Sequence, residues 1–200
     1  MTDIKLLVAT TNAGKTREIQ TCLQSLPVEV VSLSDLKIRE FFPENRQTFL
    51  ENARGKSLYY QRTWKGLTLG EDSGLEIDFL GGAPGIRSAR FSDPGATDER
   101  NIRKVLKLMT GVPQEKRHAR FVSSMVLSLG HKILTEIQEQ VPGFITQEKS
   151  GEYGFGYDPI FFYAPLNRTF AQLPPEEKNK ISHRGRALKK LREYLEKHLT

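Results

Sequence analysis

The chain has 200 residues, 38% of them hydrophobic, and its 30 basic and 24 acidic side chains give a net charge of +6. A chain of this length buries about 70% of its unfolded surface, so it can form a core without disulfides or a structural metal. No apolar run approaches the roughly 18 residues that span a bilayer, and Met1-Thr2-Asp3 lacks the basic start of a signal peptide. We therefore expect residues 1–200 to form a single cytoplasmic domain, with the lone Cys22 as a small buried side chain.

The basic side chains are concentrated in the second half of the chain. Residues 101–200 carry 17 bases against 10 acids, while residues 1–100 are nearly neutral. This surplus is typical of a solvated basic helix, and equally of a surface that attracts a nucleotide phosphate or a nucleic acid.

The first sixty residues predict alternating strands and helices. Residues 4–10 are short, apolar and followed by small polar residues, which is typical of a buried strand. Apolar side chains at helical spacing over 17–26, ended by Pro27, predict a helix before a strand at 28–32. A second helix is expected over 49–60.

The rest of the chain adds antiparallel strands. An apolar approach at 67–69 predicts a strand that ends at Glu71-Asp72, and a helix is expected from Thr97-Asp98 to just before Gly111. Together with the first sixty residues this predicts an α/β fold with a mixed sheet. The remaining elements are a hairpin of strands 121–129 and 133–141 around Gly130-His131, a strand at 160–163 and a final helix after Ser182.

The loop after the first predicted strand has the composition of an anion site. Backbone N–H groups at the start of a helix attract phosphate, and Lys15 adds a positive charge. The loop is similar to a P-loop, but Ala9 stands where that motif has Gly. An ordinary strand-to-helix turn is the alternative. The candidate phosphate-binding residues are Thr10, Thr11, Asn12, Ala13, Gly14 and Lys15.

Two adjacent acids, Glu71 and Asp72, are followed by Ser73 and a glycine. Successive side chains of a strand point to opposite faces, so the two acids can share one orientation only if the chain turns after them. One acid could then hold Mg²⁺ while the other accepts a proton from an attacking water. A solvated acidic turn is the alternative, and Glu40 or Glu44 could supply a further ligand.

The stretch from Gly151 to Asp158 alternates glycines with aromatic residues. Glycine weakens a strand, so we expect a loop that presents an aromatic face on which a base can stack. For one of Phe155 and Tyr157, a place in the core is the expected alternative.

A basic segment, from Lys178 to Arg184, leads into the final predicted helix. His183 and Arg184 would put positive charge at a helix N-terminus, which the helix dipole disfavours. An unfavourable local arrangement of this kind, with no compensating charge visible in the sequence, indicates a functional site. A surface-exposed basic helix start is the alternative. Arg184 offers a planar fork of donors and Lys178 a compact charge.

Seven motifs in order resemble the inosine triphosphate pyrophosphatase family, the nonstandard purine nucleoside triphosphate pyrophosphatases. Together they extend over nearly the whole chain. They are T-x-N-x-G-K at 10–15, T-F-x-E-N-A at 48–53, E-D-S-G-L at 71–75, G-G-A-P-G-I at 81–86, S-A-R at 88–90, F-G-Y-D-P-I-F at 155–161 and E-K-x-x-I-S-H-R at 177–184.

The resemblance implies Mg²⁺-dependent hydrolysis of ITP, dITP and XTP to the nucleoside monophosphate and pyrophosphate, by a homodimer that cleanses the nucleotide pool. It implies an elongated fold of two lobes around a central mixed sheet, with the nucleotide in the cleft between them. It also assigns Asp72 as metal ligand and proton acceptor, and Thr10 to Lys15 as the phosphate loop. The other implied substrate contacts are Lys56, Ser73, Arg90, Phe155, Gly156, Tyr157, Asp158, Lys178, His183 and Arg184.

Chemistry is consistent with this assignment, because a donor such as Arg184 rewards the 6-oxo group of inosine and xanthosine and is left unpaired against adenine. One departure concerns the metal: many family members carry two adjacent acids before T-F-x-E-N-A, whereas this chain has Pro43-Glu44. The spacing to Thr48 favours Glu44 over Glu40 as second metal ligand.

Three other functions compete with this one. A related house-cleaning pyrophosphatase for other modified nucleotides would keep the phosphate residues and change the base pocket. A basic nucleic-acid-binding module would use the positive C-terminal half, but Glu71 and Asp72 disfavour a stable nucleic-acid partner. A P-loop NTPase would release orthophosphate, and Ala9 disfavours it.

Overall fold

The apolar segments predicted as strands lie in a seven-stranded sheet in the computed structural model, which describes residues 4–199. The strands are β1 (Ile4–Ala9), β2 (Val28–Ser32), β3 (Leu67–Ile77), β4 (His118–Leu129), β5 (Lys132–Ile145), β6 (Phe161–Tyr163) and β7 (Arg168–Thr169). Their order in the sheet is β2-β1-β3-β4-β5-β6-β7. β1 pairs parallel with β2 and β3, while β6 pairs antiparallel with β5 and β7. The predicted mixed α/β sheet is confirmed.

Helices flank this sheet, as predicted, and the helix capping signals explain where several of them begin. Thr48 and Glu51 form a reciprocal capping box, and Thr97 caps the next helix by accepting a hydrogen bond from the Arg100 N–H. Within residues 4–199 no helix is both long and apolar enough to cross a bilayer. The α-helices are α1 (Ala13–Leu23), α2 (Phe49–Trp64), α3 (Asp98–Leu108), α4 (Pro175–Ile181) and α5 (His183–Leu199).

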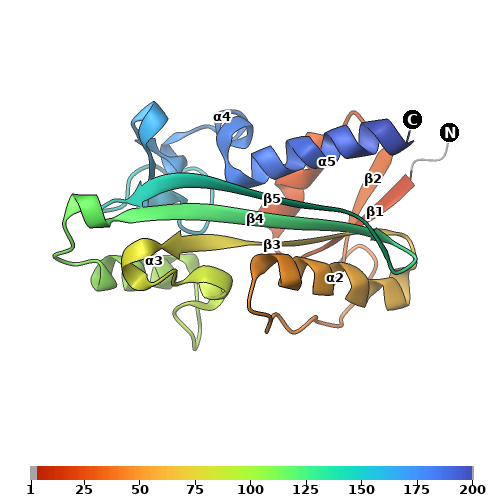
Figure 1. Cartoon of the computed structure of the whole chain (residues 1–200), viewed down its shortest axis with the longest axis horizontal. Helices are drawn as coiled ribbons and strands as arrows, with labels where there is room; N and C mark the ends of the chain where they lie inside the picture. Colours follow the sequence, from red (N-terminus) through yellow and green to blue (C-terminus); the bar gives the residue numbers. More distant parts are fainter. Residues whose placement is uncertain (1–3, 200) are drawn as a thin grey trace. The chain divides into compact units, whose positions relative to one another are not determined.

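The described residues group into two compact units, and the ribbon of Figure 1 allows their segments to be followed along the sequence. Unit 1 contains residues 4–72, 123–139 and 184–199. Unit 2 contains residues 73–122 and 140–183. The chain passes from one unit to the other within β3, β4 and β5 and between His183 and Arg184. The predicted cleft between two lobes stays a prediction.

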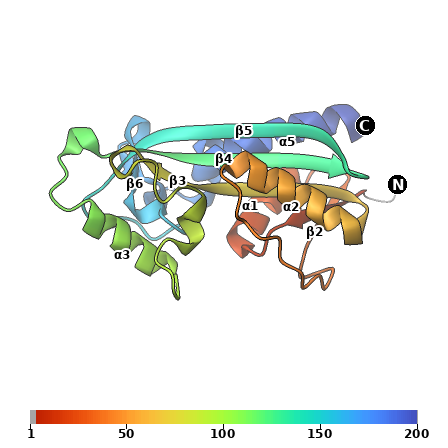
Figure 2. The ribbon, with the colours of Figure 1, turned by 60° about the horizontal axis from the view of Figure 1, so that its bottom comes forward.

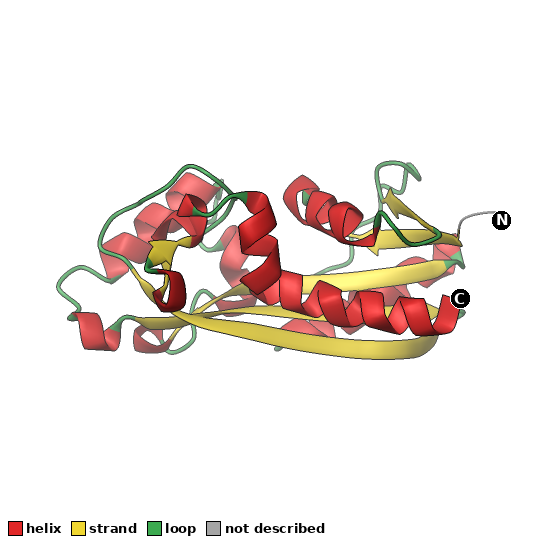
Figure 3. Ribbon diagram, turned by 90° about the horizontal axis from the view of Figure 1, so that it is seen from above, coloured by secondary structure: helices red, strands yellow, loops and turns green. Residues whose placement is uncertain are grey.

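Unit 1 has apolar layers on both faces of its strands. α1 and α5 cover one face, where Leu6, Ile19 and Leu191 are fully buried. Tyr60 of α2 packs on the other face, and Figure 1 shows α2 and α5 on opposite sides of the strands. Figure 3 shows α5 running along the sheet to the C-terminus. Burying each such Leu or Ile contributes about 1.5–3 kcal/mol, so this packing holds both helices in place.

Unit 2 has a core of aromatic rings and one amphipathic helix. The rings of Phe121 and Phe161 lie 4.5 Å apart between centroids, and Phe161 and Phe170 lie 4.8 Å apart. α3, visible in Figure 2, packs Ile102 and Val105 into this core. Edge-to-face and tilted aromatic contacts of this kind add to simple area burial.

The structure corrects the predicted boundaries of a strand and a helix and adds one helix. β3 does not end at Glu71-Asp72 but continues to Ile77, so the acids lie inside a strand. α1 begins at Ala13 rather than at residue 17, because the Asn12 side chain caps it by accepting a hydrogen bond from the Lys15 N–H at 3.0 Å. α4 was not predicted, and it carries Lys178. Cys22 is only partly buried, against the unit 1 core.

Candidate active site

The adjacent carboxylates Glu71 and Asp72 lie on opposite faces of β3 in unit 1, because successive side chains of a strand alternate between its two faces. Asp72 faces α2, and Glu71 faces α1 and the start of α5. The predicted chain turn after the acids is absent, and no solvated acidic turn forms, because both carboxylates are buried and paired with cations. The acids therefore have separate surroundings and separate chemistry.

Asp72 is held by two side chains from one face of α2. The Asn52 Nδ2–H donates to Asp72 Oδ2 at 3.0 Å, and Lys56 Nζ lies 3.6 Å from Asp72 Oδ1. Asn52 and Lys56 are four residues apart on the helix, so they share a face. Glu44 reaches the same ammonium group, with Oε1 2.5 Å from Lys56 Nζ, and Lys56 Nζ also donates to the Glu71 carbonyl oxygen at 3.0 Å. Two carboxylates thus share one buried cation.

The close approach of α2 to β3 depends on Gly70. A Cβ atom at this position would overlap the backbone carbonyl oxygen of Ala53 on α2. Only a residue without a side chain allows this contact, and the contact brings the Asn52 and Lys56 side chains within reach of Asp72. Gly70 therefore sets the geometry of the site although it has no functional group.

Burial and charge act against each other on this face. Burial raises the pKa of Asp72, and the positive charges of Lys56 and Lys15 offset this only in part. Burial would lower the pKa of Lys56, but the carboxylates of Asp72 and Glu44 outweigh it and the pKa is raised. A carboxylate whose pKa is raised is a better proton acceptor than an ordinary surface Asp.

Glu71, on the opposite face, is completely buried between two cations. Its Oε2 lies 2.7 Å from Lys15 Nζ, and its Oε1 lies 3.2 Å from Arg184 Nε. Arg184 also donates through Nη1 to Glu18 on α1 at 2.6 Å. Burial alone would raise the pKa of Glu71, but Lys15 and Arg184 outweigh it and hold this pKa well below its usual range. Glu71 therefore acts as an ionised anchor for both cations.

These pairs explain how positive charge is tolerated at the start of α5. Arg184 is only 3% exposed and His183 only 4%, so the alternative of a surface basic helix start is wrong. The carboxylates of Glu71 and Glu18 compensate the unfavourable interaction of Arg184 with the helix dipole. The predicted role of Arg184 in reading the base stays a prediction, and its guanidinium already binds these two carboxylates.

The predicted phosphate loop lies at the N-terminus of α1 in the same unit. Thr10 is buried, whereas Thr11, Asn12 and Ala13 are exposed. The first turn of α1 has no acidic side chain of its own, which favours an anion at this helix end. We call the unit 1 set the charged cluster: Lys15, Glu18, Glu44, Asn52, Lys56, Glu71, Asp72 and Arg184.

Unit 2 holds a second set, built on the glycine-rich loop. Asp158 and Lys178 form a buried ion pair at 2.6 Å, and the Phe155 N–H donates to Asp158 Oδ2 at 3.0 Å. Lys178 Nζ also lies 4.8 Å from the centre of the half-buried Phe155 ring. Gly154 has φ +77°, and a Cβ atom there would overlap Asp158 Oδ2. The predicted loop is confirmed, and one ion pair fixes its aromatic ring.

Other predicted residues of unit 2 have structural partners. Tyr157 is buried in the core, as expected for one of the two aromatics, and its hydroxyl donates to the Ser88 carbonyl at 2.8 Å. The His183 ring stacks on Phe121 with 4.6 Å between centroids. The Gly156 N–H donates to Asp98 at 2.7 Å. We call the unit 2 set the aromatic cluster: Phe155, Gly156, Tyr157, Asp158, Lys178 and His183. Ser73, on β3, and Arg90, in the 3-10 helix Gly85–Arg90, are half-buried in the same unit.

Metal binding can be judged from the donor set. Glu44 and Asp72 supply hard oxygen ligands of the kind that Mg²⁺ binds together with water and phosphate oxygens, and both carboxylates lie against Lys56 Nζ. Residues 4–199 contain no ready cluster of three or more His, Cys, Asp or Glu side chains for a metal. Two carboxylates fit an ion that they bind weakly by themselves and that substrate phosphates bind more tightly. Glu40 lies elsewhere, with Oε2 3.5 Å from the Thr63 hydroxyl.

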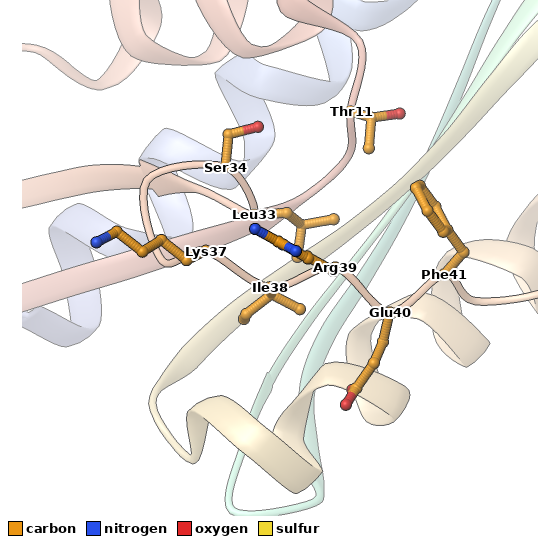
Figure 4. Close-up of a pocket in the computed structure, with 8 residues that line it drawn as sticks. All are labelled: Thr11, Leu33, Ser34, Lys37, Ile38, Arg39, Glu40 and Phe41. Atoms are coloured by element: carbon orange, nitrogen blue, oxygen red, sulfur yellow. The ribbon is translucent and has the colours of Figure 1, made fainter.

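A separate pocket of about 500 Å³ lies in unit 1 beside the loop that leads to Glu44 (Figure 4). Arg39 is one of its lining residues, and the side chains of Lys37 and Glu40 extend in different directions. Phe41 is 73% exposed. The pocket shares Thr11 with the predicted phosphate loop.

Sequence reasoning missed three residues that the structure places in contact with predicted ones. Asn52 binds Asp72, Glu18 binds Arg184, and Asp98 binds the Gly156 N–H. The spacing of Asn52 and Lys56 on one face of a predicted helix could have identified Asn52. Nothing in the local sequence distinguishes Glu18 from a solvent-exposed helix acid.

A mixed α/β sheet with buried carboxylates and a lysine in the first turn of a helix is typical of proteins that bind nucleotide phosphates. The Ham1 family model matches residues 6–194, and the chain belongs to that family. This confirms the family resemblance found in the sequence.

Individual relatives are similar over nearly their full length. The chain is 45% identical to the dITP/XTP pyrophosphatase of Caldanaerobacter subterraneus subsp. tengcongensis over 98% of both chains. It is 41% identical to the dITP/XTP pyrophosphatase of Bacillus subtilis, over 95% of this chain and 96% of that protein. The structure of the Staphylococcus aureus Ham1 protein superposes with a TM-score of 0.86 at 35% identity, covering 96% of this chain and 98% of that one.

Proposed function

We propose that this protein hydrolyses deaminated purine nucleoside triphosphates, namely ITP, dITP and XTP, to the nucleoside monophosphate and pyrophosphate. One observation carries the proposal: a buried Asp72 and Glu44 share Lys56 in a chain 45% identical to a dITP/XTP pyrophosphatase. In the proposed reaction, water forms a bond to the α-phosphorus and the bond from that atom to the bridging oxygen breaks. Pyrophosphate is the leaving group.

Within the charged cluster, Asp72 accepts the proton from the attacking water. Its raised pKa and its hydrogen bond from Asn52 support this role. Lys15, in the first turn of α1, and Lys56 neutralise phosphate charge. Mg²⁺, held by Glu44 and Asp72, would supply further neutralisation of the phosphates.

The aromatic cluster binds the base and sugar in this proposal. The Phe155 ring supplies a stacking face, and Lys178 and Asp158 hold the loop that carries it. The cationic fork of Arg184 is the proposed donor to the 6-oxo group that distinguishes hypoxanthine and xanthine from adenine.

A panel of nucleotides tests the proposal. Purified protein is given dITP, XTP, GTP, ATP and dUTP, with Mg²⁺ or with a chelator, and pyrophosphate and orthophosphate are measured separately. We expect Mg²⁺-dependent release of pyrophosphate from dITP and XTP, with far slower release from ATP and GTP. Orthophosphate release from ATP, or equal rates for all five nucleotides, would contradict the proposal.

The family resemblance also motivates proposals for assembly and location. We propose that the protein acts as a homodimer in the cytoplasm, where it meets the nucleotide pool. Light scattering coupled to size-exclusion chromatography measures the mass in solution. A mass near twice 22.7 kDa is expected, and a monomer mass would contradict the dimer.

A further inference from the structure

Asn52 is fully buried in the first turns of α2 and uses both ends of its amide. Its Nδ2–H donates to Asp72 Oδ2 at 3.0 Å. Its Oδ1 accepts a hydrogen bond from the Arg46 N–H at 3.2 Å. One side chain therefore links β3 to the irregular segment before α2.

That segment carries Glu44, two residues before Arg46. Its end is pinned to α2 a second time, because Glu51 Oε2 accepts from the N–H groups of Gln47 and Thr48 at 3.1 Å. Glu51 thus fixes the segment to the helix, whereas Asn52 connects it to Asp72. Of the two, only Asn52 contacts a carboxylate of the charged cluster.

The two α2 side chains bind different oxygens of Asp72. Asn52 binds Oδ2, and Lys56 lies next to Oδ1. A carboxylate held at one oxygen by a fixed amide cannot rotate freely about its last bond, so its second oxygen keeps its direction. This second oxygen faces the ammonium that Glu44 also contacts.

We propose that Asn52 is a positioning residue, which fixes the orientation of Asp72 and its spacing from Glu44 so that the two carboxylates bind a divalent cation together. The inference rests on the proposed function, since that function gives Asp72 and Glu44 their roles. Hydrogen-bond partners of metal ligands typically change metal affinity or activity by about 10–100-fold when they are removed.

Two variants remove the amide in different ways. Asn52→Ala leaves a small cavity, whereas Asn52→Leu keeps the volume and loses both hydrogen bonds. Gln61→Ala is the matched control, because Gln61 is also a buried amide of α2, 1% exposed, and bonds to Gly66, Thr68 and Gly130. None of these partners belongs to the charged cluster.

The first readout is cation binding without nucleotide. Mn²⁺ prefers the same oxygen ligands as Mg²⁺, and free Mn²⁺ is counted by electron paramagnetic resonance. We expect both Asn52 variants to weaken Mn²⁺ binding about 10-fold or more. Gln61→Ala should lower the thermal midpoint by as much as Asn52→Ala and leave Mn²⁺ affinity within twofold of the parent.

The second readout is the division between kcat and KM for dITP at saturating Mg²⁺. A positioning role predicts a kcat loss of at least 10-fold in Asn52→Leu with KM within about threefold. Native Mn²⁺ affinity and native kcat in Asn52→Leu, or losses in Gln61→Ala equal to those in Asn52→Ala, would overturn the proposal. If the parent binds Mn²⁺ but releases no pyrophosphate from dITP, the proposed function fails while the Mn²⁺ comparison still decides the role of Asn52.

Discussion

The charged cluster of unit 1 and the aromatic cluster of unit 2 stabilise buried charge by different means. In the charged cluster, Lys15, Lys56 and Arg184 pair with carboxylates from three separate parts of unit 1, namely α1, the segment before α2 and β3. In the aromatic cluster a single ion pair, between Asp158 and Lys178, holds one loop. The first arrangement suits the neutralisation and hydrolysis of a polyphosphate, and the second suits the presentation of a flat ring.

The difference predicts distinct kinetic effects. Removing a group of the charged cluster that acts on the reacting phosphates, such as Asp72, should lower kcat. Removing a group from the aromatic cluster should raise KM, because its contacts are the same before and during the reaction.

The largest effect is expected for Asp72→Asn. We predict a kcat loss of about 10²–10⁴-fold, the range for loss of a positioned proton acceptor. The thermal midpoint at pH 7 should stay the same or rise. The pKa of Asp72 is higher in the folded than in the unfolded protein, so its ionised form destabilises the folded state at neutral pH. Steady-state kinetics and thermal unfolding check both parts. An unchanged kcat would remove Asp72 from the reaction.

The next largest effect is expected on stability, for Glu71→Gln. Breaking a buried ion pair leaves Lys15 and Arg184 undercompensated, and we predict a loss of about 3 kcal/mol in the free energy of unfolding at pH 7. Urea unfolding of both proteins measures it. Glu18→Gln is the control, since Glu18 is partly exposed and Arg184 keeps Glu71 in that variant.

The Glu71→Gln variant also tests how the free energy of unfolding depends on pH. The pKa of Glu71 is lower in the folded protein than its ordinary value of 4.5, so its contribution is complete at neutral pH and declines as the pH falls below about 4.5. The stability difference between the parent and Glu71→Gln should therefore shrink on acidification. A difference that grows towards acid pH would contradict the anchoring role.

A smaller effect is expected for Phe155→Ala. Loss of one stacked base contact costs about 1–3 kcal/mol of binding, so KM for XTP should rise at least fivefold with little change in kcat. Phe155→Tyr, which keeps a stacking face, is the matched control and should stay near the parent. A kcat loss without a KM change in Phe155→Ala would remove the distinction between the two clusters.

The smallest effect is expected on stability, for two glycine substitutions in the aromatic cluster. Comparing them separates the cost of backbone strain from the cost of a steric clash. Gly154→Ala and Gly156→Ala both place a side chain at positive φ, which costs about 1–2 kcal/mol. Only the first also overlaps Asp158, while the second has open space around the added atom. We predict that Gly154→Ala is the less stable of the two in urea unfolding. Equal losses would show that Asp158 moves aside without cost.

Most of the helices and strands were predicted from the sequence because residues close together in the chain determine them. Val28–Ser32 and the hairpin around Gly130-His131 were expected from periodicity and turn residues, and both formed. The predicted strand was shorter than β3 because two adjacent acids such as Glu71-Asp72 are typical of a strand end. The strand continues because Lys15, Lys56 and Arg184, all far away in sequence, neutralise these acids.

The candidate site divides in the same way. Lys15, Asp72 and Glu44 were identified from motifs and spacing, and the structure brings all three into the charged cluster. The contacts of Glu18 and Asn52 were missed because they depend on how α1 and α2 pack on β3. A local sequence pattern does not report which distant residue a helix face will meet.

The most direct measurement is a single comparison of kcat and KM for XTP in the parent, Asp72→Asn and Phe155→Ala, with pyrophosphate as the detected product. We predict that the parent releases pyrophosphate, that Asp72→Asn loses kcat by at least 10²-fold, and that Phe155→Ala raises KM at nearly native kcat. Native turnover in Asp72→Asn, or a Phe155→Ala defect confined to kcat, would contradict the division of work between the two clusters.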